Sequence, residues 1–261
     1  MCISGSVGKG GVNHQSDVKT IQILLNLNTD PLTPLAPLQE DGKIGAKTIL
    51  AIEEFQRRTG MSAPDGRVDP GGGTLKKLRE ALPRTVTEEI LQAIMPGAKP
   101  LVVRHYFTAL VTSMAAYQIN TPLRMAHFLA QIGHESGDLR YSEEIASGEN
   151  YEGRRNLGNT EPGDGRKFKG RGLIQLTGRA NYTAYGKYKG RDFLEGNNPR
   201  LIATDPSLAV DVAGWFWSEH GLNVVSDTDN VKAVTKIING GYNGLDDRTA
   251  RLARAKCFLA L

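Results

Sequence analysis

The segment Phe128-Leu-Ala-Gln-Ile-Gly-His-Glu-Ser-Gly137 constrains the fold more than any other part of the chain. Its apolar residues recur at helical spacing and lead into His134 and Glu135, and a second carboxylate, Glu144, follows nine residues after Glu135. A continuous helix would put the two carboxylates on opposite faces, roughly 13 Å apart along the axis. Gly137 can adopt a left-handed conformation, so we expect the helix to end there and the chain to fold back.

The composition is that of an ordinary folded protein, and its 261 residues suffice for two domains. No apolar run approaches the length of about 20 residues that a membrane span needs, and the N-terminus lacks the regions of a signal peptide. We therefore expect that the protein does not insert into a membrane and that it accumulates in the cytoplasm. Cys2 and Cys257 stand at opposite ends of the chain. We expect reduced thiols rather than a disulfide, and no metal cluster.

Positive charge is concentrated in one part of the chain. The formal net charge is only +4, but the segment 153–191 holds ten Lys or Arg residues against two acidic residues. Such a basic strip attracts nucleic acid, a membrane face or an acidic cell-wall polymer, and a solvated face is the alternative. Tyr182, Tyr185 and Tyr188 lie within it and could stack on bases or on sugar rings. No nucleic-acid-binding motif accompanies them, so we expect no nucleic-acid partner.

The first part of the chain carries a degenerate internal repeat. Asp41-Gly-Lys-Ile-Gly-Ala-Lys-Thr48 is echoed by Asp65-Gly-Arg-Val-Asp-Pro-Gly-Gly-Gly-Thr74. Each copy predicts an Asp-Gly turn followed by a helix that the Thr caps. With an earlier helix that starts near Asp17, the repeat predicts a bundle of three short helices.

These residues resemble a peptidoglycan-binding module of the three-helix type, over about residues 5–82. The resemblance implies bacterial peptidoglycan as a partner, but the turn pattern does not identify the side chains that bind it. The loop from Thr29 to Gln39 is longer than the module's usual connection and contains three prolines, and we expect it to modify the binding surface. We place the module in residues 1–83 and a second domain in residues 84–261.

The second domain is predicted to be mainly helical. Its expected helices are Glu88 to Met95, Pro100 to Gln118, Thr121 or Pro122 to Ser136, Pro206 to Glu219, Asn230 to Ile238 and Asp246 to Leu259. Between the third and fourth of these, Gly170-Arg-Gly-Leu-Ile-Gln-Leu-Thr-Gly178 predicts an extended strand with Gln175 and Thr177 on one side. Its glycines would let the backbone approach a ligand. Trp215 and Trp217 are expected in the core.

Four segments in this order resemble glycoside hydrolase family 19, the chitinase-like lysozyme group. They are the segments 128–137 and 170–178, Trp215-Phe-Trp217 and Ile237-Ile-Asn-Gly-Gly241. The resemblance runs from about Val86 to the C-terminus. It implies a lysozyme-like, mostly helical domain with a small β element beside a sugar-binding cleft. No cofactor is implied, and no metal is expected, because position 138 is Asp where a zinc protease would have its second histidine.

The resemblance assigns Glu135 as general acid and Glu144 as general base of an inverting hydrolase. One carboxyl protonates the leaving sugar oxygen and the other activates a water, which needs a gap of about 6.5–9.5 Å. Glu135 follows an apolar helix, which favours a protonated acid, whereas Glu144 stands in a polar loop. Glu143 remains open as an alternative base. Thr177 would help to hold the attacking water.

The same comparison implies a set of sugar-binding residues. They are Gln175, Asn181, Tyr182, Asn239 and Arg248. Arg248 would fix a carboxylate or the cleft wall, and a surface ion pair with Asp246 or Asp247 is its alternative role. His134 is expected to orient Glu135 or to pack beside it.

Together these features predict a monomeric peptidoglycan muramidase of the phage endolysin type. The module and the basic strip favour peptidoglycan, whose peptide stems carry carboxylates, over neutral chitin. A chitinase of the same family and a non-catalytic wall-binding protein are the alternatives. Such an endolysin would accumulate in the host cytoplasm and reach the wall, in the periplasm, after a separate membrane lesion of the holin type.

Overall fold

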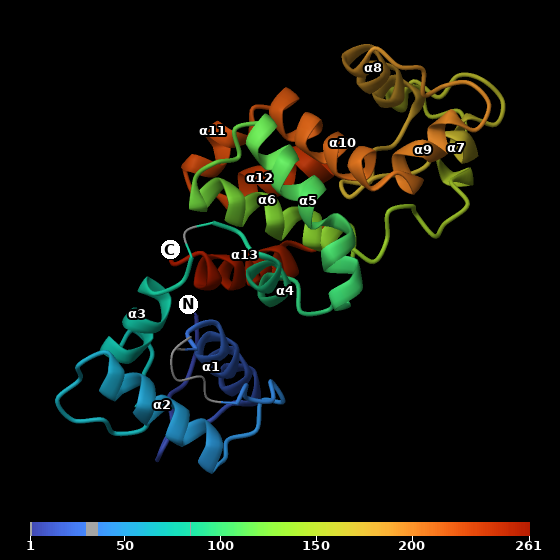
Figure 1. Cartoon of the computed structure of the whole chain (residues 1–261). Coiled ribbons are helices and arrows are strands. Elements are labelled where there is room, and N and C mark those ends of the chain that lie inside the picture. Colours follow the sequence, from blue (N-terminus) through green and yellow to red (C-terminus); the bar gives the residue numbers. More distant parts are fainter. Residues whose placement is uncertain (1, 30–35, 84) are drawn as a thin grey trace. The chain divides into compact units, whose positions relative to one another are not determined.

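The computed structural model describes residues 2–29, 36–83 and 85–261 and is mainly helical, as predicted (Figure 1). The chain forms two compact units. The first comprises Met1–Ala93 with Ala253–Leu261, and the second comprises Ile94–Leu252. Residues 30–35, the centre of the predicted proline-containing loop, lie outside the described residues, so the effect of that loop on binding stays a prediction.

The first unit is a small helical bundle with a two-residue β pairing. Its elements are β1 (Val7–Gly8), α1 (Gln15–Leu27), α2 (Ala46–Arg58), β2 (Arg67–Val68), α3 (Gly73–Glu80), most of α4 (Glu88–Ile94) and the end of α13 (Leu245–Phe258). Strand β1 pairs antiparallel with β2, Val7 opposite Val68. Ile21, Ile52 and Leu78, which the helical spacing directs inward, are fully buried. The predicted three helices therefore share one apolar core.

The threonines of the repeat do not cap helices as predicted. Helices α2 and α3 each begin after a glycine that makes no side-chain cap. Thr48 and Thr74 lie inside these helices and are buried. Each hydroxyl instead accepts a hydrogen bond from a side-chain amide. Gln22 donates to Thr48 at 3.4 Å, and Gln56 donates to Thr74 at 3.0 Å. The threonine position in the repeat is therefore explained by a buried hydrogen bond.

The same two glutamines hold the Asp-Gly turns. Gln56 Nε2 donates to Asp65 Oδ1 at 2.7 Å, and its Oε1 accepts the Gly66 N–H at 3.0 Å. Gln22 makes the equivalent bonds to the first turn, at 3.1 and 2.9 Å. The hydrogen bond from Gln56 holds the pKa of Asp65 below its usual value. The glutamine, aspartate and threonine side chains at each copy of the repeat thus form a structural hydrogen-bond network.

A disulfide joins Cys2 to Cys257, with the Cα atoms 4.9 Å apart. The expectation of reduced thiols is therefore wrong. The two residues are 255 positions apart, and they meet because the end of α13 belongs to the same unit as the first residues of the chain. Arg79 of α3 also holds this end, since its Nε donates to the carbonyl of Cys257 at 3.3 Å.

Loss of this disulfide should destabilise the first unit. We expect Cys2→Ser to lower its free energy of unfolding by about 2–4 kcal/mol, because the crosslink restricts the unfolded chain. Thermal unfolding followed by circular dichroism checks this, with reduced wild type as the matched control. The reduced protein should unfold at the same temperature as Cys2→Ser, and the variant should be insensitive to reductant. A wild-type midpoint that reductant leaves unchanged would contradict the prediction.

The second unit is built around helix α6. Its elements are α5 (Pro100–Ala116), α6 (Pro122–Glu135), η1 (Glu149–Tyr151), η2 (Arg155–Leu157), α7 (Asp164–Lys167), α8 (Arg179–Lys189), α9 (Asn198–Thr204), α10 (Pro206–Glu219), α11 (Leu222–Asp227), α12 (Val231–Asn239) and the first part of α13. Helix α10 packs against α5 and α9, and α6 contacts α11 and α12 (Figure 1). Trp215 and Trp217 are buried as predicted. Trp217 meets Phe128 of α6 edge to face, with ring centroids 5.3 Å apart. The helix that carries Glu135 is thereby anchored in the core.

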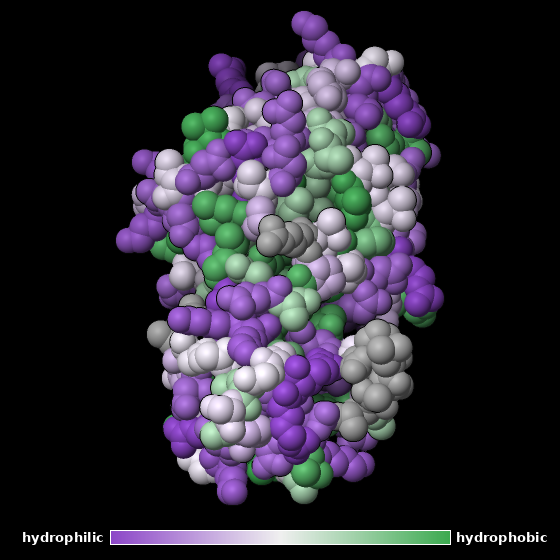
Figure 2. Space-filling model, turned by 60° about the vertical axis from the view of Figure 1, so that its left-hand side comes forward, coloured by the Kyte–Doolittle hydropathy of each residue, from purple (hydrophilic) through white to green (hydrophobic). Residues whose placement is uncertain are grey.

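The surface carries hydrophobic residues only in small groups on the face that Figure 2 shows, where hydrophilic side chains surround them. Isolated patches of this kind need no partner to cover them. Among the described residues, no helix combines the length and the apolar character that crossing a membrane would require.

Candidate active site

Helix α6 ends at Glu135, and the chain turns immediately after it. Gly137 has φ 57°, and the two residues after it are also left-handed, with φ 59° and 63°. The turn is held by Ser136, whose Oγ accepts the N–H of Leu139 at 2.8 Å. The predicted left-handed conformation of Gly137 is confirmed. Glu135 consequently stands at the last position of a buried helix, with 17% of its side chain exposed.

After the turn, the chain runs alongside residues 170–172. The N–H of Gly172 donates to the carbonyl of Ser142 at 2.8 Å, and the N–H of Glu144 donates to the carbonyl of Gly170 at 2.9 Å. The carboxylate of Glu144 accepts the Gly170 N–H at 3.0 Å and the hydroxyl of Tyr151 at 3.0 Å. Neutral donors therefore hold Glu144 in a half-buried position.

Tyr151 is a residue that the sequence analysis missed. Burial, and then the hydrogen bond to Glu144, raise the pKa of Tyr151, so its phenol stays protonated and continues to donate to the carboxylate. The only signal in the sequence is a tyrosine seven residues after Glu144. That spacing has no meaning until the loop is folded.

Glu143 has different partners from Glu144. It forms an ion pair with Arg171 at 3.0 Å, and the Nζ of Lys169 lies 3.6 Å away. Arg171 is itself buried, with 4% exposed. A carboxylate whose oxygen is already engaged by two cations is less available to bind and orient a catalytic water. These contacts favour Glu144 as the base.

The predicted strand across residues 170–178 is wrong, because the segment forms a tight turn. Arg171 and Leu176 exchange both backbone hydrogen bonds, at 3.1 and 2.8 Å. Gln175 has φ 57°, a left-handed conformation that no strand contains. A Cβ on Gly172 would lie 2.3 Å from Val212 Cγ1. This glycine is therefore needed for packing against α10, not for the approach of a ligand.

The turn presents Thr177 beside two other predicted residues. Thr177 Oγ1 donates to the carbonyl of Gln175 at 2.9 Å, and Asn181 Nδ2 donates to the carbonyl of Thr177 at 2.8 Å. Because its proton is committed, the hydroxyl oxygen of Thr177 can accept a hydrogen bond from a water. Gln175 Nε2 closes the turn by donating to Gly172 O at 3.0 Å. Asn239 is exposed at the end of α12.

Tyr182 has no surface at which a sugar could contact it, which contradicts its predicted role in sugar binding. It is fully buried, its hydroxyl donates to Lys169 O at 2.8 Å and it accepts a hydrogen bond from Arg171 at 3.0 Å. Tyr185 is fully buried too, and only Tyr188 is exposed. The three tyrosines therefore form no stacking platform. Helix α8 turns two of them into the core, which the spacing of tyrosines in the sequence did not reveal.

Arg248 is buried and meets only one of its predicted roles. Its side chain is 1% exposed, and its Nη2 lies 2.5 Å from Glu135 Oε1. Its Nη1 donates to Gln131 Oε1 and its Nε to Asn243 O at 3.2 Å. These contacts exclude direct sugar binding and the alternative surface ion pair. Arg248 instead fixes a carboxylate, the other role that the resemblance implied, and that carboxylate is Glu135.

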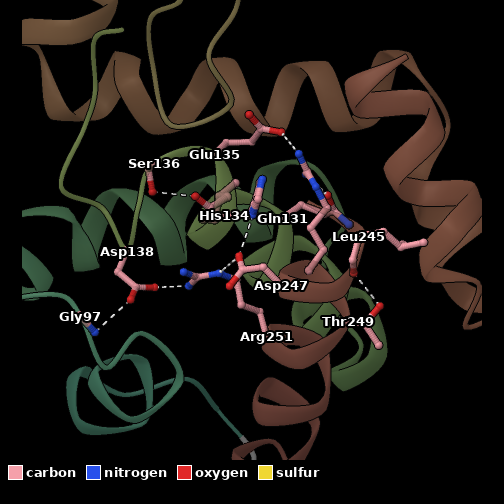
Figure 3. A network of polar contacts seen from close by, with 12 residues as sticks. Gly97, Gln131, His134, Glu135, Ser136, Asp138, Leu245, Asp247, Thr249 and Arg251 are labelled. Atoms are coloured by element: carbon pink, nitrogen blue, oxygen red, sulfur yellow. Dashed lines mark hydrogen bonds and ion pairs between the residues drawn. The ribbon is translucent and has the colours of Figure 1, made fainter. Parts of the chain in front are cut away.

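A second network of polar contacts lies beside the contacts of Arg248. His134 Nδ1 is 2.7 Å from Asp247 Oδ2, and Arg251 Nε donates to the same oxygen at 2.6 Å. Arg251 also pairs with Asp138, which accepts the N–H of Gly97 at 2.9 Å. Figure 3 shows this network leaving the end of α6, while the side chain of Glu135 points away from it. Helix α13 thus contacts the last turn of α6 through two adjacent residues, Asp247 and Arg248.

Asp247 is charged in this network. Burial opposes its ionisation, but the hydrogen bonds from His134 and Arg251 outweigh burial and hold the pKa of Asp247 below its usual value. His134 thus pairs with Asp247, whereas the side chain of Glu135 meets Arg248, so the predicted role of His134 beside Glu135 stays a prediction. Within residues 2–29, 36–83 and 85–261, no group of three or more His, Cys, Asp or Glu is arranged to hold a metal ion.

The first unit contains a candidate binding pocket of about 760 Å³. It lies between α1, α2 and the segment 36–47, and its lining includes the cations Lys43, Lys47 and Arg58. Leu50, which also lines it, is 58% exposed. No pattern in the sequence indicates this pocket, because its wall combines residues from two helices and a connecting segment.

Comparison with known proteins identifies both parts of the chain. Residues 112–253 match the family described as chitinase class I, glycoside hydrolase family 19. The chain belongs to glycoside hydrolase family 19. Residues 14–78 match a putative peptidoglycan binding domain. The protein is therefore a family 19 glycosidase with an N-terminal peptidoglycan-binding domain.

Individual relatives agree with this assignment. A family 19 domain-containing protein of Haemophilus influenzae is 33% identical over 201 residues, which cover 65% of this chain and 94% of that protein. An endochitinase of Arabidopsis thaliana is 35% identical over 177 residues, which cover 65% of this chain and 60% of the plant protein. Chitinase C of Streptomyces griseus has the same fold, with a TM-score of 0.56 and 23% identity over 67% of this chain and 92% of that one. The expected lysozyme-like, mostly helical fold of the family 19 domain is confirmed.

Proposed function

We propose that the protein is a peptidoglycan muramidase that cuts the β-1,4 glycan backbone of the bacterial cell wall. One observation carries this proposal: a peptidoglycan-binding domain and a family 19 glycosidase domain occur on the same chain. A wall-bound domain keeps the glycosidase at a high local concentration of peptidoglycan. The pocket of the first unit is the candidate site for that attachment.

The reaction we propose uses Glu135 as general acid and Glu144 as general base. Glu135 gives its proton to the leaving sugar oxygen, and Arg248 then stabilises the carboxylate that remains. Glu144 takes a proton from the attacking water, which Thr177 Oγ1 helps to orient. Tyr151 and the Gly170 N–H hold the base in place. Attack by water from the far side of the sugar would invert the anomeric centre.

A chitinase is the second candidate function. It is favoured by the relatives described as endochitinases, which match the family 19 domain. Chitin and peptidoglycan share the β-1,4 linkage, so both substrates fit the same two carboxylates. The peptidoglycan-binding domain favours the first candidate. A protein that only binds the wall is disfavoured, because Glu135 and Glu144 are both held by specific hydrogen bonds.

We further propose that the protein is a monomer and acts as a phage endolysin. It would leave the host cytoplasm through a separate membrane lesion and act on the wall in the periplasm. The disulfide between Cys2 and Cys257 supports action outside the cytoplasm, since such bonds form in oxidising compartments.

The decisive experiment digests purified peptidoglycan and chitin oligomers with wild type, Glu144→Gln and Glu143→Gln. Loss of the base should lower kcat at least about 100-fold in Glu144→Gln, whereas Glu143→Gln should keep most of the activity. Circular dichroism checks that both variants fold. Borohydride reduction and mass spectrometry identify the new reducing ends, which we expect on muramic acid.

Three results would contradict the proposal. A higher kcat/KM on chitin oligomers than on peptidoglycan fragments would identify a chitinase. New free amines without new reducing ends would indicate cleavage of the peptide stems. A larger loss in Glu143→Gln than in Glu144→Gln, with both variants folded, would reverse the assignment of the base.

A further inference from the structure

The ten cations of the segment 153–191 fall into two groups. Five of them have a carboxylate within ion-pair distance: Arg166 pairs with Glu149, Lys169 and Arg171 with Glu143, Arg179 with Asp164, and Lys189 with Asp211. Among the described residues, no ion pair is formed by the other five, which are Arg154, Arg155, Lys167, Lys187 and Arg191. In the described parts of the chain, this second group therefore has no ion pair with which an anionic ligand would compete.

Arg154 lies beside the proposed catalytic base. Its guanidinium carbon is 5.9 Å from the centre of the Tyr151 ring, and the hydroxyl of Tyr151 donates to Glu144 at 3.0 Å. The ring of Tyr151 therefore lies between the guanidinium of Arg154 and the carboxylate of Glu144, which would activate water. A ligand bound to Arg154 would lie close to the reacting sugar.

The loop that carries Arg154 is held on both sides. The N–H of Arg154 donates to Tyr151 O at 3.3 Å, and its carbonyl accepts the N–H groups of Leu157 at 2.9 Å and Asn159 at 3.2 Å. Asn159 is fully buried, and its amide donates to Tyr151 O at 2.8 Å. The side chains of Arg154 and Arg155 are both exposed. A ligand would meet a positive charge on a backbone that is already ordered, which lowers the entropy cost of binding.

Nearby acidic residues do not compensate this charge. Glu152 accepts the N–H groups of Gly163 and Gly165, at 2.7 and 2.8 Å. Glu149 is paired with Arg166. The planar guanidinium of Arg154 therefore remains available to a carboxylate, which it can bind through two parallel hydrogen bonds.

We propose that Arg154, assisted by Arg155, binds a carboxylate of the peptide stem beside the scissile bond and makes the enzyme prefer peptidoglycan to chitin. Chitin has no carboxylate, whereas the stems of peptidoglycan carry them. Arg154 is thus a specificity-determining residue, and its role rests on the proposed muramidase function. A hydrogen bond between charged groups that only peptidoglycan can form raises kcat/KM on that substrate about tenfold or more.

The test compares wild type, Arg154→Gln and Arg191→Gln on three soluble substrates. These are peptidoglycan fragments with intact stems, the same fragments with carboxylates converted to methylamides, and a chitin hexamer. Arg191→Gln is the matched control, because its guanidinium also lies over an aromatic ring, Phe193, at 5.5 Å. We expect Arg154→Gln to lower kcat/KM about tenfold on the intact fragments only. Amidation should lower the wild-type value by a similar factor and leave the variant unaffected.

Each other result overturns the inference. An equal loss on all three substrates would mean that Arg154 only supports the loop. A loss that persists after amidation would point to another anion, such as a phosphate. No loss on intact fragments, with wild type active, would refute the role of Arg154 alone. Wild type without activity on peptidoglycan would refute the proposed function and this inference together.

Discussion

Glu135→Gln should lower kcat on peptidoglycan by about 100-fold to 10,000-fold, because an amide cannot donate the proton that the leaving sugar oxygen needs. Arg248 keeps its hydrogen bonds to Gln131 and to Asn243 O in this variant, and the new amide oxygen can still accept from it. We therefore expect a folded protein of lower stability, which circular dichroism checks. The measurement is the rate of new reducing ends on purified peptidoglycan. Glu149→Gln is the matched control, because the same chemical change occurs at an exposed glutamate that is paired with Arg166.

A substrate with a different leaving group distinguishes the role of the acid, Glu135, from that of the base, Glu144. A nitrophenyl glycoside releases a leaving group that needs little protonation, so Glu135→Gln should hydrolyse it with a much smaller loss. Glu144→Gln should stay inactive on the same substrate, because water still needs its base. If Glu135→Gln clears the wall as fast as wild type, Glu135 is not the acid. If both variants respond alike to the activated substrate, their roles are not those of acid and base.

Arg248→Met should destabilise the second unit by about 1–3 kcal/mol, because it leaves the carboxyl group of Glu135 without its hydrogen-bond partner in a mostly buried position. It also removes the bonds to Gln131 and to Asn243 O. Chemical denaturation measures the free energy of unfolding. We expect kcat to fall as well, because the position of Glu135 is no longer fixed.

A double-mutant cycle distinguishes this ion pair from general loss of packing. Arg248→Met combined with Glu135→Gln should cost less stability than the sum of the two single changes, since both alter the same contact. If the two effects simply add, Arg248 and Glu135 do not couple, and Arg248 does not stabilise the fold through Glu135. Arg251→Met is a useful comparison, because Arg251 lies in the adjacent network and is 21% exposed. We expect its effect on stability to be smaller.

Local patterns in the sequence predicted most of the secondary structure. The helix Pro206–Glu219 has the predicted bounds. Helix α6 begins after Thr121, whose hydroxyl accepts the N–H of Arg124 at 3.2 Å, and ends one residue before its predicted end. These features depend on contacts within one turn of the chain, which a sequence displays directly. The turn at 172–175 was missed, because alternating residues looked like a strand and the left-handed conformation of Gln175 has no such local signal.

Predictions for the site residues failed or stayed open where the contacts that decide their roles are distant in the sequence. Whether Glu143 or Glu144 acts as the base could not be inferred from two adjacent glutamates. Arg171 and Lys169, more than twenty residues away, distinguish them by pairing with Glu143. Tyr182 was assigned to sugar binding because an exposed and a buried tyrosine look alike in a sequence. Its burial follows from the packing of α8.

The sequence by itself determined that a helix ends within one residue of Glu135, that the chain turns at Gly137, and that two glutamates follow within reach of that turn. It also indicated the repeat of the first unit, because an Asp-Gly turn followed by a threonine recurs in 41–48 and 65–74. Only the tertiary structure decided which groups hold the carboxylates. Arg248 is 113 residues from Glu135, and Cys2 is 255 residues from Cys257. Such pairs form only when the whole chain has packed, since burial and charge balance depend on neighbours that are distant in the sequence.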